Sequence, residues 1–409
     1  MKKLSLFFMV MALVLLVTAC GNKSGKTEID FLNFSSNGGQ EETLAKMVEA
    51  FEKENPDIKV NIETLGYDDY FTQLAIRVAG NQAPDVFELN IENFRAYADK
   101  EAIAEIDTTQ VDVSEIHETA LGAFKIGNKQ FGLPTKFSNV VLIYNKDLFD
   151  QAGIAYPTND WDWEDELEAA QAIRALGDDI FGVFRPIQTH EFYKTVAQNN
   201  GSMMNAAQTE FTLNSAANIE ALEMMIARVN THNVTPNVEQ LGGMGDWDLF
   251  LSGRLGMIVT GIWAFSTFAN DAEFEWDIVV EPGIKKKATH FFSDAVVVSS
   301  KSKEKEAATK FAAFLAGSPE TAILRANANW DLPVALTDEV VTAYKAITPP
   351  ANKQAVFDSL NYLVMPPSLE RFNEVADDLM TYVNRAIAGE ITAEQALDQA
   401  QAFIANKYK

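Results

Sequence analysis

Apolar positions along the chain follow two alternating periods, one typical of strands and one of helices. Short apolar or alternating runs over residues 29–34, 58–62 and 85–89 predict strands. Between them, residues 44–51 and 71–78 carry apolar side chains at the i, i+3, i+4, i+7 spacing of one helical face. The resulting β-α-β-α-β order predicts an α/β fold with parallel strands and helices on both faces of the sheet.

Ligand sites in sheets of this kind lie at the carboxyl ends of the strands. The loops after Phe34 and after Leu89 lie at such ends, so we expect them to border a binding site.

The pattern continues to the end of the chain without an internal repeat. The Asp162 side chain is expected to cap a helix, with Asp165 three residues later, and Thr392 to Gln395 fits a capping box. The predicted strands cover residues 140–144, 256–260 and 295–298, and the predicted helices cover 163–175, 304–315, an apolar stripe over 372–386 and a last helix after Thr392.

Composition narrows the class of protein. The 409 residues are 47% hydrophobic, enough for two domains with cores of their own. The formal net charge of −25 disfavours nucleic acid as a partner, because phosphate backbones would be repelled. The four histidines are widely spaced and the single cysteine allows no intrachain disulfide, so we expect no metal site.

The first twenty residues predict an export signal. Two lysines precede an apolar run over residues 4–17, which is too short to span a bilayer and typical of a signal peptide over residues 1–19. The run ends in Val-Thr-Ala-Cys-Gly, which resembles the bacterial lipobox. We therefore expect lipidation of Cys20, a tether over residues 20–26, and a protein anchored on the extracytoplasmic face of the cell membrane. An ordinary signal peptide with a chance cysteine is the alternative.

No catalytic motif is present. The sequence lacks GxSxG, a P-loop, GxGxxG and HExxH, so we expect no catalytic residues, no cofactor and no enzyme. A pair of carboxylates flanking a cleft, as in glycosidases, stays open. The acidic cluster over residues 159–165 could suggest calcium, but it lacks the glycine turn of an EF-hand, which favours a capped helix start.

Aromatic residues beside loop signals are candidates for binding sugar. Aromatic faces stack on the apolar faces of sugar rings, while neighbouring polar groups bond the hydroxyls. For each of these side chains a place in the core is the alternative. The candidates are Phe34, Tyr67, Trp247, Trp263 and Trp330, of which Trp263 stands out because Gly261-Ile262-Trp263 follows a strand end.

A further set of segments is informative through its order along the chain: Phe51 to Val60, Ala83 to Val86, Gly132 to Pro134, Leu142 to Phe149, Trp163 to Leu167, Gly253 to Trp263 and Ala295 to Leu315. Taken in this order, these segments resemble the family 1 extracellular solute-binding proteins of ABC importers, the group that contains maltose-binding protein. The resemblance covers nearly all of residues 27–405.

The resemblance implies a two-lobed fold like that of periplasmic binding proteins, with ligand buried between lobes that close about a hinge. Each lobe would be discontinuous in sequence, joined by crossings near Pro134–Asn139, Phe291–Ala295 and Ile347–Ala351. The implied first lobe comprises residues 27–135 and 295–347, and the second comprises residues 136–294 and 348–409.

The resemblance also implies a set of ligand-binding residues. Some members have a Trp in the loop near Leu89, which this chain lacks. The implied set is Phe34, Ser36, Asn37, Glu88, Asn90, Glu92, Lys136, Ser138, Asn139, Tyr193, Trp247, Trp263, Trp330, Arg371 and Phe372.

The function implied is that of a monomeric substrate-binding lipoprotein, which captures a neutral sugar or oligosaccharide and delivers it to the permease subunits of an ABC importer. Two alternatives stay open. The same scaffold could take a polyamine or peptide, and the chain could instead be a secreted glycoside-active enzyme.

Overall fold

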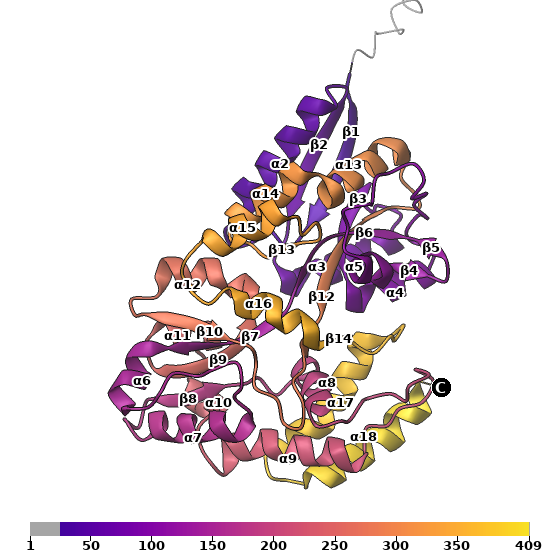
Figure 1. Ribbon diagram of the computed structural model, residues 1–409. Helices are drawn as coiled ribbons and strands as arrows, with labels where there is room; N and C mark the ends of the chain where they lie inside the picture. Colours follow the sequence, from indigo (N-terminus) through magenta and orange to yellow (C-terminus); the bar gives the residue numbers. More distant parts are fainter. Residues whose placement is uncertain (1–24, 409) are drawn as a thin grey trace, which may run out of the picture.

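The computed structural model describes residues 25–408 and consists of two α/β lobes, one above the other in Figure 1. The expected signal peptide, Cys20 and most of the expected tether lie outside the described residues. No helix of the described part is long and apolar enough to cross a membrane.

The first lobe is built on a six-stranded sheet in the order β13-β6-β12-β3-β1-β2. Strands β1, β2 and β3 are parallel, which confirms the predicted β-α-β-α-β unit, whereas β6 and β12 run antiparallel to their neighbours. The strands are β1 (Thr27–Asn33), β2 (Ile58–Thr64), β3 (Val86–Asn90), β6 (Gly132–Ser138), β12 (Phe292–Val298) and β13 (Leu332–Pro333), with a small hairpin of β4 (Lys125–Ile126) and β5 (Lys129–Gln130).

Helices cover this sheet, and they come from both ends of the chain. Figure 1 shows α2 lying next to α14 and α13, although more than 250 residues separate them in sequence. The rings of Phe31 in β1 and Phe51 in α2 both pack on Phe311 of α13, with centroids 5.2 and 5.1 Å apart. The helices are α2 (Glu41–Glu54), α3 (Tyr67–Ala79), α4 (Ile91–Asp99), α5 (Glu118–Ala123), α13 (Lys305–Gly317), α14 (Pro319–Asn327) and α15 (Asp338–Ala346).

The second lobe has a four-stranded sheet in the order β10-β7-β9-β8, with a two-stranded pair of β11 and β14 near the first lobe. The predicted caps are confirmed, because Asp162 with Asp165 and Thr392 with Gln395 each form a capping box. The strands are β7 (Val140–Asn145), β8 (Phe181–Phe184), β9 (Leu255–Gly261), β10 (Trp276–Val279), β11 (Thr289–His290) and β14 (Leu363–Val364).

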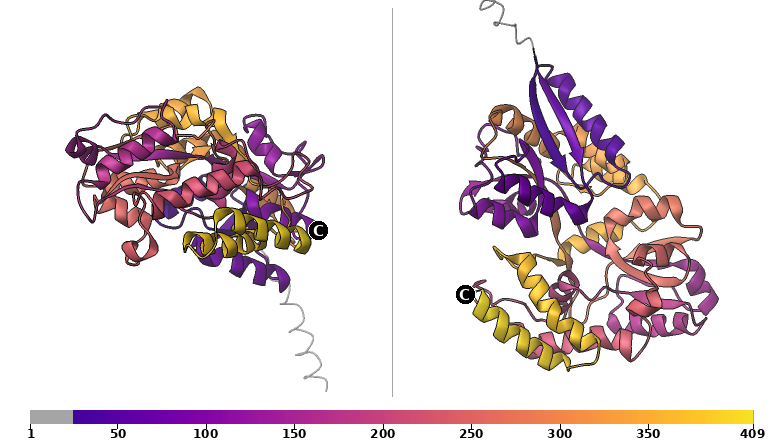
Figure 2. Two further views of the ribbon diagram at one scale, coloured as in Figure 1. Left: turned by 90° about the horizontal axis from the view of Figure 1, so that it is seen from below. Right: turned by 180° about the vertical axis from the view of Figure 1, so that it is seen from behind.

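The helices of the second lobe form its outer layer. Figure 2 shows α17 and α18 as a hairpin at the C-terminal end of the chain, drawn in yellow. The helices are α6 (Lys146–Ala152), α7 (Trp163–Arg174), α8 (Thr189–Gln198), α9 (Ala216–Asn230), α10 (Val238–Leu241), α11 (Asp246–Leu251), η1 (Ile262–Ala264), α12 (Phe265–Asp271), α16 (Gln354–Ser359), η2 (Leu360–Tyr362), α17 (Phe372–Ile387) and α18 (Ala393–Lys407).

The chain passes between the lobes three times. The first passage runs from β6 to β7 through Asn139, the second from β11 to β12 through Phe291, and the third from α15 to α16. Residue Ser138 still pairs with Phe292 in the first sheet. The first two passages therefore lie about three residues from the expected lobe boundaries, because sheet pairing carries β6 and β12 further toward the hinge.

The lobes touch beside the hinge in this conformation. The Asn373 side chain at the start of α17 donates a hydrogen bond of 2.9 Å to Asn93 Oδ1 in α4 of the first lobe. The Asn139 side chain donates one of 2.8 Å to the carbonyl oxygen of Val356 in α16. A further polar contact between the lobes lies at the cavity, where His190 Nε2 of the second lobe is 3.8 Å from Glu92 Oε1 of the first.

Candidate functional site

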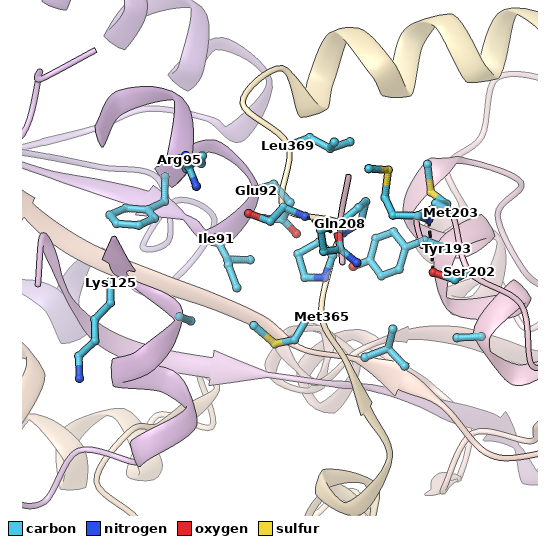
Figure 3. Close-up of a pocket in the computed structure, with 18 of the residues that line it drawn as sticks. Ile91, Glu92, Arg95, Lys125, Tyr193, Ser202, Met203, Gln208, Met365 and Leu369 are labelled. Atoms are coloured by element: carbon cyan, nitrogen blue, oxygen red, sulfur yellow. Dashed lines mark hydrogen bonds between the residues drawn. The ribbon is translucent and has the colours of Figure 1, made fainter. Parts of the chain in front are cut away.

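A cavity of about 410 Å³ lies between the lobes and takes its walls from both. From the first lobe come the start of α4 and the segment before β5; from the second come α8, the loop after it and the segment that leads to α17 (Figure 3). The lining mixes apolar and polar side chains, as clefts for small polar molecules require. It includes Ile91, Glu92, Arg95, Lys125, Tyr193, Ser202, Met203, Gln208, Met365 and Leu369.

Glu92 and Tyr193 are the two residues of the implied binding set that line this cavity. They face it from opposite lobes: Glu92 lies in the first turn of α4 and Tyr193 lies in α8. The tyrosine hydroxyl lies 3.0 Å from Nδ1 of His290 in β11, next to the second passage. This contact links Tyr193 in the wall of the cavity to the strand that leads into the second passage.

A row of aromatic rings runs from the hinge to the cavity. The ring of Trp263 lies 5.6 Å edge-to-face from Phe292, which in turn lies 5.9 Å from the His190 ring. The His190 ring lies 5.5 Å from Phe372 and 6.1 Å from Tyr193. The structure therefore brings three residues of the implied set, Trp263, Phe372 and Tyr193, into one row at the lobe boundary.

Trp263 is the exposed member of this row, with 38% of its surface accessible. It lies in η1 immediately after β9, and its ring folds back over Gly261. A Cβ atom added at Gly261 would lie 2.0 Å from the Trp263 ring, closer than any real contact. The Trp263 ring can therefore occupy this position only because residue 261 has no side chain.

We predict that Gly261→Ala displaces the Trp263 ring, because the added methyl group cannot share its space. The expected results are a shift in tryptophan fluorescence and a weaker affinity for the solute, measured by titration calorimetry. Gly127→Ala is a control on another glycine, since a Cβ there meets nothing within 4 Å. Unchanged fluorescence and affinity in Gly261→Ala would contradict the prediction.

Lys136 is the centre of a second group of implied residues. Its ammonium lies 2.9 Å from Asp294 and 3.1 Å from Asp331, and 5.8 and 5.9 Å from the rings of Phe34 and Trp330. The two carboxylates outweigh the cost of burial and hold the pKa of Lys136 above its usual value, so it is charged. The group joins the ends of β1, β6 and β12 to the segment around β13.

Four implied polar residues are bonded within the fold in this conformation. Glu88 accepts hydrogen bonds from the Phe34 and Ser35 amides at 3.1 and 3.0 Å, which fixes the loop after β1. Ser36 bonds to the Asn33 side chain at 2.7 Å. Asn90 caps α4, and Asn139 is bonded to α16 as described above.

The other implied residues have separate surroundings. Trp330 is 4% exposed and donates to the Ser35 carbonyl, and Trp247 donates to Thr260 Oγ1 at 3.2 Å. Arg371 pairs with Glu374 at 2.9 Å on the surface. Asn37 is exposed in the loop after β1, and Ser138 is buried at the end of β6. None of these contacts tests ligand binding, and the roles stay predictions.

Four side chains at the lobe boundary were not in the implied set. Tyr67, 51% exposed at the start of α3, packs edge-to-face on Phe34 and accepts a hydrogen bond from Asn90. His190, Gln208 and Met365 belong to the second lobe, and the last two line the cavity. Tyr67 was a candidate from the sequence because it is an aromatic residue next to a predicted loop. The other three lie in a helix, a loop and a proline-rich segment without a local signal.

A buried ionic network lies behind Tyr193 in the second lobe. Arg185 binds Glu166 through Nε at 2.9 Å and Glu281 through Nη1 at 2.6 Å. The Lys194 ammonium donates to Glu281 and to Glu191 Oε1, the latter at 2.6 Å. The other oxygen of Glu191 lies 3.9 Å from His290 Nε2. The neighbouring cations hold the pKa of Glu191 well below its usual value despite burial. This network fixes α8, and with it Tyr193.

Trp163 packs against the same network. Its ring lies 3.9 Å from the Arg228 guanidinium and 4.8 Å from that of Arg185. This packing and the Asp162 cap agree with the predicted capped helix start. In the part of the chain that the structure describes, no group of three or more His, Cys, Asp or Glu side chains could hold a metal ion.

Comparison with known proteins identifies the class that this fold and site define. Residues 36–322 match the family model of bacterial extracellular solute-binding proteins, and the chain belongs to that family. The expected two-lobed α/β fold is confirmed, and the chain is a substrate-binding protein of ABC importers rather than an enzyme.

Three relatives show how far the similarity extends. An ABC substrate-binding protein from Listeria monocytogenes, solved in complex with cycloalternan, is 43% identical, with a TM-score of 0.89 and coverage of 93% of this chain and 99% of that one. The arabinooligosaccharide-binding protein of Bacillus subtilis is 26% identical over 346 residues, 78% of each chain. Maltose-bound MalE3 of T. maritima, 20% identical with a TM-score of 0.79 and coverage of 92% and 99%, shows the shared fold.

Proposed function

We propose that this protein captures an oligosaccharide between its two lobes and delivers it to the permease subunits of an ABC importer. The observation that carries the proposal is the cavity between the lobes, with Glu92 on one wall, Tyr193 on the other and the Trp263–Phe292–His190 row beside it. Aromatic faces and neighbouring polar groups are what a sugar ring needs. The 43% identity to a protein solved with cycloalternan supports this choice of ligand class.

Lobe closure supplies the signal to the permease in this proposal. A ligand that contacts both walls binds the closed form better than the open form and shifts the hinge equilibrium by that difference in affinity. The protein acts as a monomer, because each chain contributes both lobes to its own site.

A thermal-shift screen followed by titration calorimetry tests the ligand class. Cycloalternan, a linear maltooligosaccharide, spermidine and a tripeptide are compared at equal concentration. A ligand at 100 times its Kd stabilises the folded state by about 2.7 kcal/mol, which the midpoint reports. We expect a sugar to bind with 1:1 stoichiometry and to be recovered intact. Binding of spermidine or the tripeptide alone would overturn the proposal, as would release of reducing ends.

We also propose that the protein is a lipoprotein anchored through Cys20 after removal of residues 1–19. The lipobox-like sequence supports this, together with the position of the first strand, which begins at Thr27 and leaves a short spacer. More than one acyl chain is needed for stable anchoring, and a lipidated N-terminal cysteine supplies this.

Replacement of Cys20 by alanine tests the anchor. We predict that Cys20→Ala moves the protein from the membrane fraction to the medium or periplasm, measured by fractionation and immunoblotting. Ser24→Ala in the tether is the control and keeps the protein at the membrane. Retention of Cys20→Ala in the membrane fraction would contradict a lipid anchor at this residue.

A further inference from the structure

The Glu92 carboxyl group is buried without a partner on one of its oxygens. Glu92 follows Ile91 in the first turn of α4, is 6% exposed and lines the cavity between the lobes. In the described part of the chain, Oε1 has no hydrogen-bond partner. Figure 3 shows the carboxyl group directed into the space that Gln208 and Tyr193 approach from the second lobe.

The groups that face Glu92 do not neutralise a negative charge. His190 Nε2 in α8 lies 3.8 Å from Oε1, and burial lowers the pKa of His190 to about 4, so its ring is uncharged at neutral pH. Asp294 in β12 adds negative charge and is itself paired with Lys136. On the same helix, Arg95 is bonded to Asp99 at 2.6 Å.

The remaining neighbours are two tyrosines and one lysine. Tyr193 in α8 is buried, and this burial together with the charge of Glu92 raises the pKa of Tyr193, so its hydroxyl stays protonated. The hydroxyl of Tyr67 in α3 accepts a hydrogen bond from Asn90. Lys125 in β4 lines the same cavity. Burial, opposed by the Glu92 backbone amide and aided by Asp294, raises the pKa of Glu92 to about 8.

We propose that Glu92 meets the solute as a neutral carboxylic acid and donates a hydrogen bond to a solute oxygen. The inference rests on the proposed function and names the group that selects the solute. A neutral acid offers a donor that hydroxyl, ring or glycosidic oxygens can accept. A cationic amine has only donors and would need a carboxylate, so this wall favours sugars over polyamines.

The proposal fixes the sign of a pH effect. The complex holds a proton on Glu92, whereas unliganded protein loses that proton as the pH rises through the pKa of Glu92. Above this pH, binding must take up a proton, so affinity falls by about tenfold per pH unit. Below it, the proton is already in place and affinity is independent of pH.

Two measurements test the proposal. The first is the carbon-13 titration of the Glu92 carboxyl group in unliganded protein, assigned by its absence in Glu92→Gln. The second is calorimetry with cycloalternan from pH 6 to 9.5, in two buffers of different ionisation enthalpy, which counts protons. Glu92→Gln retains a donor and is expected to bind at pH 6 within a few-fold of wild type, with affinity independent of pH. Glu49→Gln, on the exposed face of α2, is the matched control and keeps the wild-type profile.

The outcomes separate the inference from the proposed function. A titration midpoint near 8, proton uptake above it and a flat profile in Glu92→Gln support the inference. A midpoint below about 5 overturns it, and so does a wild-type affinity that is constant to pH 9.5. Failure of every sugar to bind at any pH would overturn the proposed function and the inference with it, whereas sugar binding without proton uptake would overturn the inference alone.

Discussion

Trp263→Ala is expected to weaken oligosaccharide binding by roughly 10- to 100-fold. Burial of a large apolar side chain is worth about 1.5–3 kcal/mol, and each 1.4 kcal/mol changes affinity about tenfold. The ring lies at the end of β9, in the row of aromatic rings that leads to the cavity, and is 38% exposed, so part of its apolar surface is available for a sugar. Titration calorimetry measures the loss.

The same substitution is expected to cost the unliganded protein much less stability than the loss of a core tryptophan, because 38% of the Trp263 surface is already exposed. Trp330 provides the contrast. It is 4% exposed, it is bonded to the Ser35 carbonyl, and it lies 4.0 Å from the Arg325 guanidinium. Trp330→Ala is expected to lower the free energy of unfolding by roughly 3–5 kcal/mol. If Trp263→Ala unfolds as readily as Trp330→Ala and binds normally, Trp263 is a core residue.

Arg185→Met is expected to lower the free energy of unfolding by roughly 3–5 kcal/mol. Arg185 is 4% exposed and bonds to both Glu166 and Glu281, each fully buried. Methionine fills much of the same space but removes the charge, which leaves two buried carboxylates with fewer partners. Loss of one partner from a buried ion pair costs about this much, because the other charge stays uncompensated. Urea unfolding followed by circular dichroism measures the change.

The matched control is Arg254→Met, on the surface of the same lobe. The Arg254 guanidinium lies 3.8 Å from Asp179, and the side chains are 32% and 74% exposed. Exposed pairs of this kind contribute about 0–1 kcal/mol. Equal stability of the Arg185→Met and Arg254→Met proteins would show that the network contributes no more than a surface pair.

The position of a candidate site residue can be predicted from the sequence only where its structural neighbours are also its neighbours along the chain. Trp263 was predicted from the turn after a strand, and the structure places it at the lobe boundary with Gly261 beneath its ring. Trp330 carried a similar loop signal, yet it is buried against Ser35, nearly 300 residues away. A pattern of neighbouring residues contains no information on such a partner, so exposed and buried aromatics look alike in sequence.

Polar candidates show the same limit. The loop after β1 and the end of β3 were predicted to meet at one edge of the sheet, and they do. Packing decides which carboxylate oxygen lacks a hydrogen-bond partner at this edge. Glu88 accepts hydrogen bonds from backbone amides of the loop after β1, whereas Glu92 Oε1 has no partner and lies at the cavity. Hydrogen-bond partners are chosen by distance in three dimensions, which spacing along the chain does not fix.

The sequence by itself determined the local elements of this protein. Periodic apolar positions fix which face of a helix or strand is buried, and capping residues such as Asp162 and Thr392 fix where helices begin, because both depend on residues a few positions apart. Tertiary structure alone decided that β12 begins at Phe292 rather than at the predicted Ala295, and that β6 is a strand as far as Ser138, because these added residues pair with each other. It also decided the cavity, since Glu92, Tyr193 and Met365 meet only where three separate crossings bring two lobes together.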